Sequence, residues 1–263
     1  MLREQQNMVF HRYRDYTTMT NASLSPHFYM LTAMASEAAT VPHLRQWYKN
    51  NEDHWESNMH TGHVSVRRAG IGQSHAYACA KSIFSQGAPH IVVFGVAGGL
   101  SPHLLPGDIV ISSSIIPQHS KEYYQANPEV LRKLTQKKSD LDPSRLFLGD
   151  ILSCESALCT PSAKEAAYRK THALAVDMES AGVARAAKEA NRPFVSIRVV
   201  CDPANRTVPE PMNSCLTQQG TVSPWRVFTA LCNSPGLIGK LPRMQKDYAL
   251  ALDGLRRVWK VLL

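Results

Sequence analysis

The sequence lacks a long apolar run, and this absence excludes a membrane-spanning helix. A helix that crosses a bilayer needs about 20 consecutive apolar residues, and no stretch of the 263 residues approaches that length. Residues 1–26 also lack the continuous apolar core of a signal peptide. We therefore expect a cytoplasmic protein in which residues 1–26 form a mobile N-terminal arm and the fold begins at residue 27.

Paired metal-binding or disulfide-forming cysteines are absent as well. The six cysteines include no C-x-x-C spacing, so reduced thiols are expected. His60 and His63 have no third ligand at a helpful spacing, and solvated loop histidines are the simpler interpretation. We predict no metal and no cofactor, with phosphate as the one co-substrate left open.

Acidic residues are fewer than basic ones: 21 Asp and Glu against 29 Lys and Arg give a formal net charge of +8. Such an excess favours an anionic partner, whether a phosphate group, a nucleic acid or a lipid surface. No basic motif with interleaved aromatic residues is present. We therefore expect no nucleic-acid partner.

What the chain does contain is a series of short apolar runs that alternate with helical patterns. Strands are predicted at 27–35, 63–72, 90–100, 106–116, 145–153 and 193–201, and helices at 74–87, 120–145 and 179–190. This alternation predicts one α/β domain over residues 27–263, with a mixed central β-sheet flanked by helices. Residues 206–263 would form a helical tail to that domain.

Charged residues stand in one of the most apolar parts of the chain. Asp177 and Glu179 flank Met178, Arg198 stands inside the apolar run VSIRVVC, and Asp202 follows the end of that run. An unpaired buried charge is costly, so Arg198 is predicted to pair with Asp177 or Glu179. A buried ion pair with no chemical role is the plainer alternative. One arginine cannot neutralise three carboxylates, however, which leaves at least one to bind a ligand or hold a proton.

A glycine-rich loop, GVAGGL at 95–100, follows a predicted buried strand. Its glycines allow backbone N–H groups to approach a ligand closely. The loop is not G-x-G-x-x-G and carries no P-loop lysine, which argues against a dinucleotide or nucleoside triphosphate. Ligands of open α/β sheets bind beyond the carboxyl ends of strands, where this loop and CDPAN at 201–205 are both expected.

The segments GVAGGLSPHLLPGDIVIS and VDMESAGVA…PFVSIRVVCDPAN, with AMASE near the first strand, resemble the superfamily of purine nucleoside phosphorylases and methylthioadenosine/S-adenosylhomocysteine nucleosidases. The likeness covers residues 27–205. The tail, from CDPANRTVPEP onward, is similar to the hopanoid-associated phosphorylases, which cleave adenine from adenosylhopane.

This resemblance implies the nucleoside phosphorylase fold and an enzyme that cleaves the N-glycosidic bond of an adenine nucleoside. Adenosylhopane is the expected substrate, with adenine released in hopanoid biosynthesis. The alternatives are a methylthioadenosine/S-adenosylhomocysteine nucleosidase and a non-catalytic nucleoside-binding protein.

The resemblance also implies roles for individual residues. Asp202 would protonate the base and Glu37, in AMASE, would activate water. The residues expected to bind substrate are Glu179 at the ribose hydroxyls, Met178 under the sugar, Asp177 and Arg198 beside them, and Val96, Ala97, Gly98, Ile71, Leu152 and Ser153 around the sugar and base.

One departure from the family's pattern precedes the expected acid. Cys201 stands where the nucleosidases often carry serine. A thiol is a weaker hydrogen-bond donor than a hydroxyl. Asp202 is therefore expected to be held more loosely here.

A second departure concerns the nucleophile. Val93 and Val96 stand where several phosphorylases carry an arginine and a serine. Arg67, Arg68 and the Gly98 amide remain as candidates for binding phosphate. The residues thus favour water as the nucleophile, whereas the likeness of the tail favours phosphate.

Two expectations concern larger assemblies. The family likeness and the symmetry of most soluble oligomers imply a homodimer. Residues 224–244 combine apolar and basic side chains, which would suit a peripheral contact with an anionic membrane surface.

Overall fold

The computed structural model describes residues 27–43, 45–46, 53–59, 62–120, 122–129, 131–132, 145–208, 239 and 241–262. The predicted arm, residues 1–26, and the greater part of the predicted membrane-contacting segment 224–244 lie outside the described residues. The strands are β1 (His27–Thr32), β2 (Arg45–Gln46), β3 (His54–Met59), β4 (Gly62–Arg68), β5 (Ile91–Gly99), β6 (Ile109–Pro117), β7 (Tyr124–Gln125), β8 (Leu146–Ser153), β9 (Ala175–Asp177) and β10 (Phe194–Asp202). The helices are α2 (Ala35–Ala38), α3 (Gln73–Ser85), α5 (Pro161–Thr171), α6 (Ser180–Ala190) and α9 (Leu241–Leu262).

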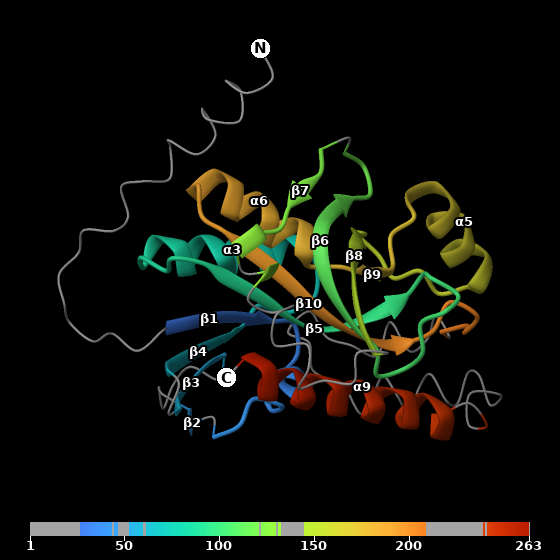
Figure 1. The fold of residues 1–263 in the computed structure, drawn as a ribbon, viewed down its shortest axis with the longest axis horizontal. Coiled ribbons are helices and arrows are strands. Elements are labelled where there is room, and N and C mark those ends of the chain that lie inside the picture. The colour runs from blue at the N-terminus through green and yellow to red at the C-terminus, as the bar shows by residue number, and fades with distance from the viewer. Residues whose placement is uncertain are drawn as a thin grey trace, which may run out of the picture.

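These strands form one mixed sheet that closes on itself at one end. β5 pairs with β10, β10 with β6, β6 with β8, β8 with β9, and β9 again with β5, so five strands form a ring. From β5 the sheet continues through β1, β4, β3 and β2 (Figure 1). The predicted α/β fold, a mixed central sheet flanked by helices, is confirmed.

Strand β5 has two different neighbours along one edge, while β10 follows the other edge. β1 pairs with β5 at Val92 and Val93, and β9 pairs with it at Gly98 and Gly99. The residues between, 94–97, face a gap between the ends of β1 and β9. A point where strand neighbours change is a favourable place for a ligand in an α/β sheet.

Helices cover both sides of the sheet (Figure 1). α3 and α6 lie together on one side, where Ala80 and Val183 are buried against Leu31 and Val93. On the other side α9 buries its apolar stripe, and Trp259 meets Phe94 with ring centroids 5.4 Å apart. Among the described residues, no helix is long and apolar enough to cross a membrane.

Two glycines bring the starts of α3 and α6 together. A Cβ atom at Gly182 would lie 2.2 Å from the backbone oxygen of Gln73, so a larger residue there would push the helices apart. Gly72, which precedes α3, has φ of 102°, a value that side chains disfavour. This close approach places the Gly72 amide beside Glu179, the residue before α6.

One expectation about elements is wrong, and one short strand was not predicted. Tyr124 and Gln125, within the predicted helix at 120–145, form β7 and pair with β6. Residues 175–177, just before the predicted helix at 179–190, form the unpredicted strand β9. Strands of two or three residues are too short to show a period in the sequence, and both exist because a longer strand lies beside them.

Candidate active site

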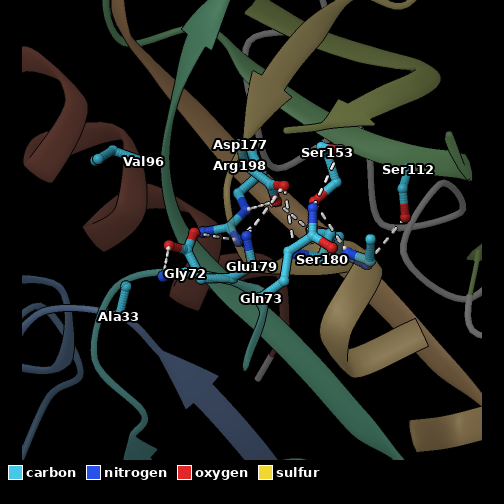
Figure 2. A network of polar contacts seen from close by, with 12 residues as sticks. Ala33, Gly72, Gln73, Val96, Ser112, Ser153, Asp177, Glu179, Ser180 and Arg198 are labelled. Carbon is cyan, nitrogen blue, oxygen red and sulfur yellow. Dashed lines mark hydrogen bonds and ion pairs between the residues drawn. The ribbon is translucent and has the colours of Figure 1, made fainter. Parts of the chain in front are cut away.

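The centre of the site is Arg198, a buried side chain on β10 that is 1% exposed. Its Nε and Nη2 atoms lie 2.8 Å and 2.7 Å from Asp177 Oδ2, and Nη2 lies 3.2 Å from Glu179 Oε2. Figure 2 shows the guanidinium between the two carboxylates. The predicted ion pair is confirmed, and Arg198 bonds both candidates rather than one.

Asp177 is committed to this framework. Its Oδ1 accepts hydrogen bonds from the amides of Ser180 at 3.2 Å and Glu179 at 3.4 Å. Its Oδ2 contacts the Ser180 hydroxyl, which in turn lies 2.8 Å from Ser196 Oγ. The bonds of Asp177 therefore fix the turn from β9 into α6 and orient Arg198.

Glu179 is buried but less fully bonded. Its Oε1 accepts one hydrogen bond, from the Gly72 amide at 3.1 Å. Burial raises the pKa of Glu179 to about 7, against the opposing effect of Arg198. A carboxylate offers about four acceptor positions, so Glu179 retains capacity for ligand hydroxyls.

Glu37 reaches the same place from α2. Its Oε2 accepts hydrogen bonds from the amides of Ala33 and Met34, both at 2.9 Å, and its Oε1 accepts one from Val96 at 2.8 Å. The Val96 amide belongs to the part of β5 that faces the gap between β1 and β9. Burial raises the pKa of Glu37, and Arg198 and the three amides counteract that rise.

The absence of a side chain at Gly95 makes room for this group. A Cβ atom there would lie 2.5 Å from Glu37 Oε1 and 2.7 Å from Arg198 Nη1. The glycine in GVAGGL thus lets two charged side chains cross the face of β5, a role that differs from the ligand approach expected from the sequence.

Asp202 lies at the end of β10, where the strand register shifts. Val200 pairs with Ala97 but Asp202 pairs with Gly98, so β10 contains one extra residue. Such irregularities re-aim a side chain near a functional site. The extra residue is Cys201, whose Sγ lies 3.2 Å from Asp202 Oδ1 and 3.4 Å from Ala97 O.

Lys164 supplies an anchor for Asp202 that no sequence pattern indicated. Its side chain is 0% exposed and its Nζ contacts Asp202 Oδ2. The looser hold on Asp202 that Cys201 led us to expect is thus offset at the other carboxylate oxygen. Lys164 was missed because it stands in SAKEAAYRK, a polar run of α5 in which a lysine is expected to face solvent.

The carboxylates occupy two ends of a short stretch of β5. Glu37 and Arg198 meet at Gly95, and Asp202 lies next to Gly98, where a Cβ atom would be 3.3 Å from its Oδ2. Three residues of strand span about 10 Å. This arrangement offers a base and an ion pair at one end and an acid at the other.

The other predicted substrate-binding residues lie near this stretch. Val96, Ala97 and Gly98 belong to β5 itself, and Met178 lies between Asp177 and Glu179. Ser153 is paired with Asp177 across β8 and β9, Leu152 precedes it, and Ile71 precedes Gly72. Their roles toward substrate stay predictions.

Arg67 and Arg68 have protein partners elsewhere. Arg67 Nη2 donates to Gln86 Oε1 at 2.9 Å, and Arg68 Nε donates to Asp53 Oδ1 at 2.6 Å. Within the described part of the chain, no hydrogen bond or ion pair connects either arginine to Glu37, Glu179 or Asp202. Their predicted phosphate role thus has no support from their contacts.

A protein family and several known proteins have sequences similar to this chain. The family described as the phosphorylase superfamily matches residues 28–221. A 5′-methylthioadenosine/S-adenosylhomocysteine nucleosidase of Shewanella loihica is 28% identical over 187 residues, which cover 64% of this chain and 80% of the relative. The corresponding nucleosidase of Pseudoalteromonas translucida is 28% identical over 165 residues, or 56% of this chain and 70% of the relative.

Solved structures agree with the fold. The 5′-methylthioadenosine/S-adenosylhomocysteine nucleosidase of S. pneumoniae, solved with a transition-state inhibitor, aligns with a TM-score of 0.66 at 19% identity, over 90% of this chain and 96% of that chain. A futalosine hydrolase mutant of Helicobacter pylori aligns with a TM-score of 0.56 at 18% identity, over 66% and 88%. At these identities the structures bear on the fold alone.

Proposed function

The chain belongs to the phosphorylase superfamily and is an enzyme that cleaves nucleoside N-glycosidic bonds; we propose that it hydrolyses an adenine nucleoside to adenine and a free sugar. The observation that carries the proposal is the placement of two carboxylates over one short stretch of β5, Glu37 at Gly95 and Asp202 at Gly98. Hydrolysis of this bond needs a base that takes a proton from the water attacking the sugar and an acid that protonates the departing purine. The related nucleosidases support adenine as the base.

At the sugar end, Glu179 accepts hydrogen bonds from the ribose hydroxyls. As the bond from C1′ to N9 breaks, positive charge develops on the sugar, and the Glu179 carboxylate stabilises that charge more than it stabilises bound substrate. Arg198 and Asp177 keep the carboxylate in place through the contacts described above. Glu179 is therefore a binding residue whose contribution grows toward the transition state.

At the base end, Asp202 gives its proton to N7 of the purine while the electron pair of the C1′–N9 bond moves into the base. Adenine then leaves as a neutral molecule instead of an anion. Burial raises the pKa of Asp202 above its ordinary value, which favours the protonated acid, whereas Lys164 lowers it. Solvent returns the proton to Asp202 after adenine departs.

Water completes the reaction at C1′. Three of the about four acceptor positions of Glu37 are used by backbone amides. The remaining one is available to take a proton from water as its oxygen bonds to C1′, and Glu37 then releases that proton to solvent. A phosphate dianion would meet the Glu37 carboxylate at this point, and the contacts of Arg67 and Arg68 with Gln86 and Asp53 offer it no charge compensation.

The 5′ substituent separates two candidate substrates. The relatives act by name on 5′-methylthioadenosine and S-adenosylhomocysteine, which favours a thioether. The likeness of the tail to the hopanoid-associated phosphorylases favours adenosylhopane. Most of that tail, residues 209–238, lies outside the described residues, so both substrates belong in the test.

The test measures adenine release from 5′-methylthioadenosine and from adenosylhopane in phosphate-free buffer. We expect adenine and free sugar without phosphate, and an about 10²–10⁴-fold loss of kcat in Glu37→Gln. Glu56→Gln, a carboxylate on β3, serves as the matched control and should retain activity. Cleavage that stops without phosphate and yields a sugar 1-phosphate when phosphate is restored would replace hydrolysis by phosphorolysis.

A further inference from the structure

We propose that Lys164 is a positioning residue for this reaction: its buried ammonium group holds Asp202 at the departing base and governs the protonation of that carboxyl. The inference rests on the proposed function of Asp202 and adds a residue to it. It starts from an unusual observation, a fully buried lysine whose charge is directed at the expected general acid.

The geometry fixes both the carboxylate and the loop that follows it. Lys164 Nζ contacts Asp202 Oδ2 and donates to the carbonyl oxygens of Pro203 at 3.1 Å and Arg206 at 3.3 Å. An ammonium group has three donors, and these contacts use all of them, with the Asp202 carbonyl oxygen as a fourth and more distant acceptor at 3.5 Å. Asp202 and the loop of residues 203–206 therefore share one anchor.

The placement of Lys164 on α5 makes the anchor rigid. Thr160 caps this helix by accepting a hydrogen bond from the Ala163 amide at 3.2 Å, directly before Lys164. Asp202, in turn, follows the register shift of β10. A helix and a strand thus determine where the ammonium and the carboxylate meet.

The charged and titratable groups that face Asp202 come from three places. Lys164 approaches from α5, the Cys201 thiol from β10, and Arg206 from the following loop. Arg206 is itself paired with Asp247 of α9. Burial raises the pKa of Asp202, and Lys164 is the largest influence that lowers it.

This balance determines in which direction the pKa of Asp202 changes when the charge of Lys164 is removed. A cation beside a carboxyl stabilises the ionised form, so its removal raises the carboxyl pKa, by about one to three pH units for a close pair. Asp202 acts as a proton donor in the proposed reaction, and activity declines as pH rises through its pKa. Loss of Lys164 charge should therefore move the alkaline limb of the pH–rate profile to higher pH.

Two substitutions separate charge from position. Lys164→Gln removes the charge but retains donors for the carbonyl oxygens, whereas Lys164→Met removes both. We expect the alkaline limb to shift upward by about one to three pH units in both variants. We expect kcat at the optimum to fall by about 10²-fold in Lys164→Met, because small displacements of a catalytic group have effects of that size, and by less in Lys164→Gln.

Three controls make the experiment decisive. Lys170→Met, an exposed lysine on the same helix, should leave the profile unchanged. Adding Lys164→Met to Asp202→Asn should cause no further loss of kcat, because Lys164 acts through Asp202. The ¹³C carboxyl signal of Asp202, assigned by its disappearance in Asp202→Asn, should titrate at higher pH in Lys164→Gln.

The outcomes distinguish this inference from the proposed function. If the parent protein releases no adenine, the proposed function fails, and the ¹³C titration still decides whether Lys164 governs Asp202. If the parent is active but neither the alkaline limb nor the Asp202 titration moves in Lys164→Gln, Lys164 is a structural cation and the inference is overturned.

Discussion

At the scale of single residues, the three carboxylates near Arg198 differ in how many hydrogen bonds they accept from the protein. Asp177 is saturated by amides, a hydroxyl and Arg198, and it serves the framework. Glu37 is held by three amides, and Glu179 by one amide and a longer contact with Arg198. Differences in bonding, and not in residue type, distinguish Asp177 from the two carboxylates that we propose act on the substrate.

The raised pKa of Glu179 leads to a prediction about the stability of the fold. Its pKa is raised from 4.5 to about 7 in the folded chain, so the folded state binds a proton more tightly than the unfolded state. Its contribution to stability is fully present below about pH 4.5 and is lost as pH rises through about 7. Glu179→Gln cannot ionise and should gain melting temperature relative to the parent across this range, while its kcat falls.

Thermal unfolding of parent and variant at several pH values measures this difference. Glu165→Gln, an exposed carboxylate on α5, provides the control and should show no comparable pH-dependent gain. A melting-temperature difference between parent and Glu179→Gln that stays constant from pH 4 to pH 8 would mean that Glu179 is not destabilised by its ionisation.

The sequence indicated some of these residues and not others. An arginine in an apolar strand requires an acidic partner, so the pairing of Arg198 was predictable from charge alone. Asp202 was singled out by its place at the end of an apolar strand, whereas its role as the acid, and Glu37 as the base, were predicted from the family resemblance. Lys164 was not predictable, because only the docking of α5 against the end of β10 buries it.

At the scale of elements, the site exists because β5 changes its neighbour. β1 pairs at Val92 and Val93, β9 pairs at Gly98 and Gly99, and Glu37 bonds the Val96 amide between them. The long apolar strands β5 and β10 were predicted from the sequence. The three-residue β9 was not, although it is the element that completes the gap and delivers Asp177.

The close packing at Gly95 leads to a prediction about β5. Its replacement by alanine would place a Cβ atom 2.5 Å from Glu37 Oε1 and 2.7 Å from Arg198 Nη1. Both charged groups would have to move, so we expect a destabilisation of about 1–3 kcal/mol and a loss of kcat. Denaturant unfolding and steady-state rates of adenine release measure these effects.

Gly239 supplies the matched control, because a Cβ atom there would meet nothing within 4 Å. Gly239→Ala should leave activity and stability close to those of the parent. A Gly95→Ala variant that is as stable and active as Gly239→Ala would show that Glu37 and Arg198 do not depend on their positions over β5.

At the scale of the whole molecule, one sheet serves two purposes. Its closed ring of five strands holds Asp202 and Asp177, and its open extension, through β1, leads to Glu37 on α2. α9 packs against β10 and β5 on the side opposite α3 and α6 (Figure 1). The homodimer and the membrane contact stay predictions.

The central claim is that Asp202 and Glu37 divide the reaction between the departing base and the water. The most direct measurement compares kcat/KM of Asp202→Asn and the parent on 5′-methylthioadenosine and on 4-nitrophenyl β-riboside, whose leaving group needs no proton. We predict an about 10²–10⁴-fold loss on the nucleoside and little loss on the riboside. Equal losses on both substrates, or no loss on either, would contradict the assignment of Asp202 as the acid for the departing base.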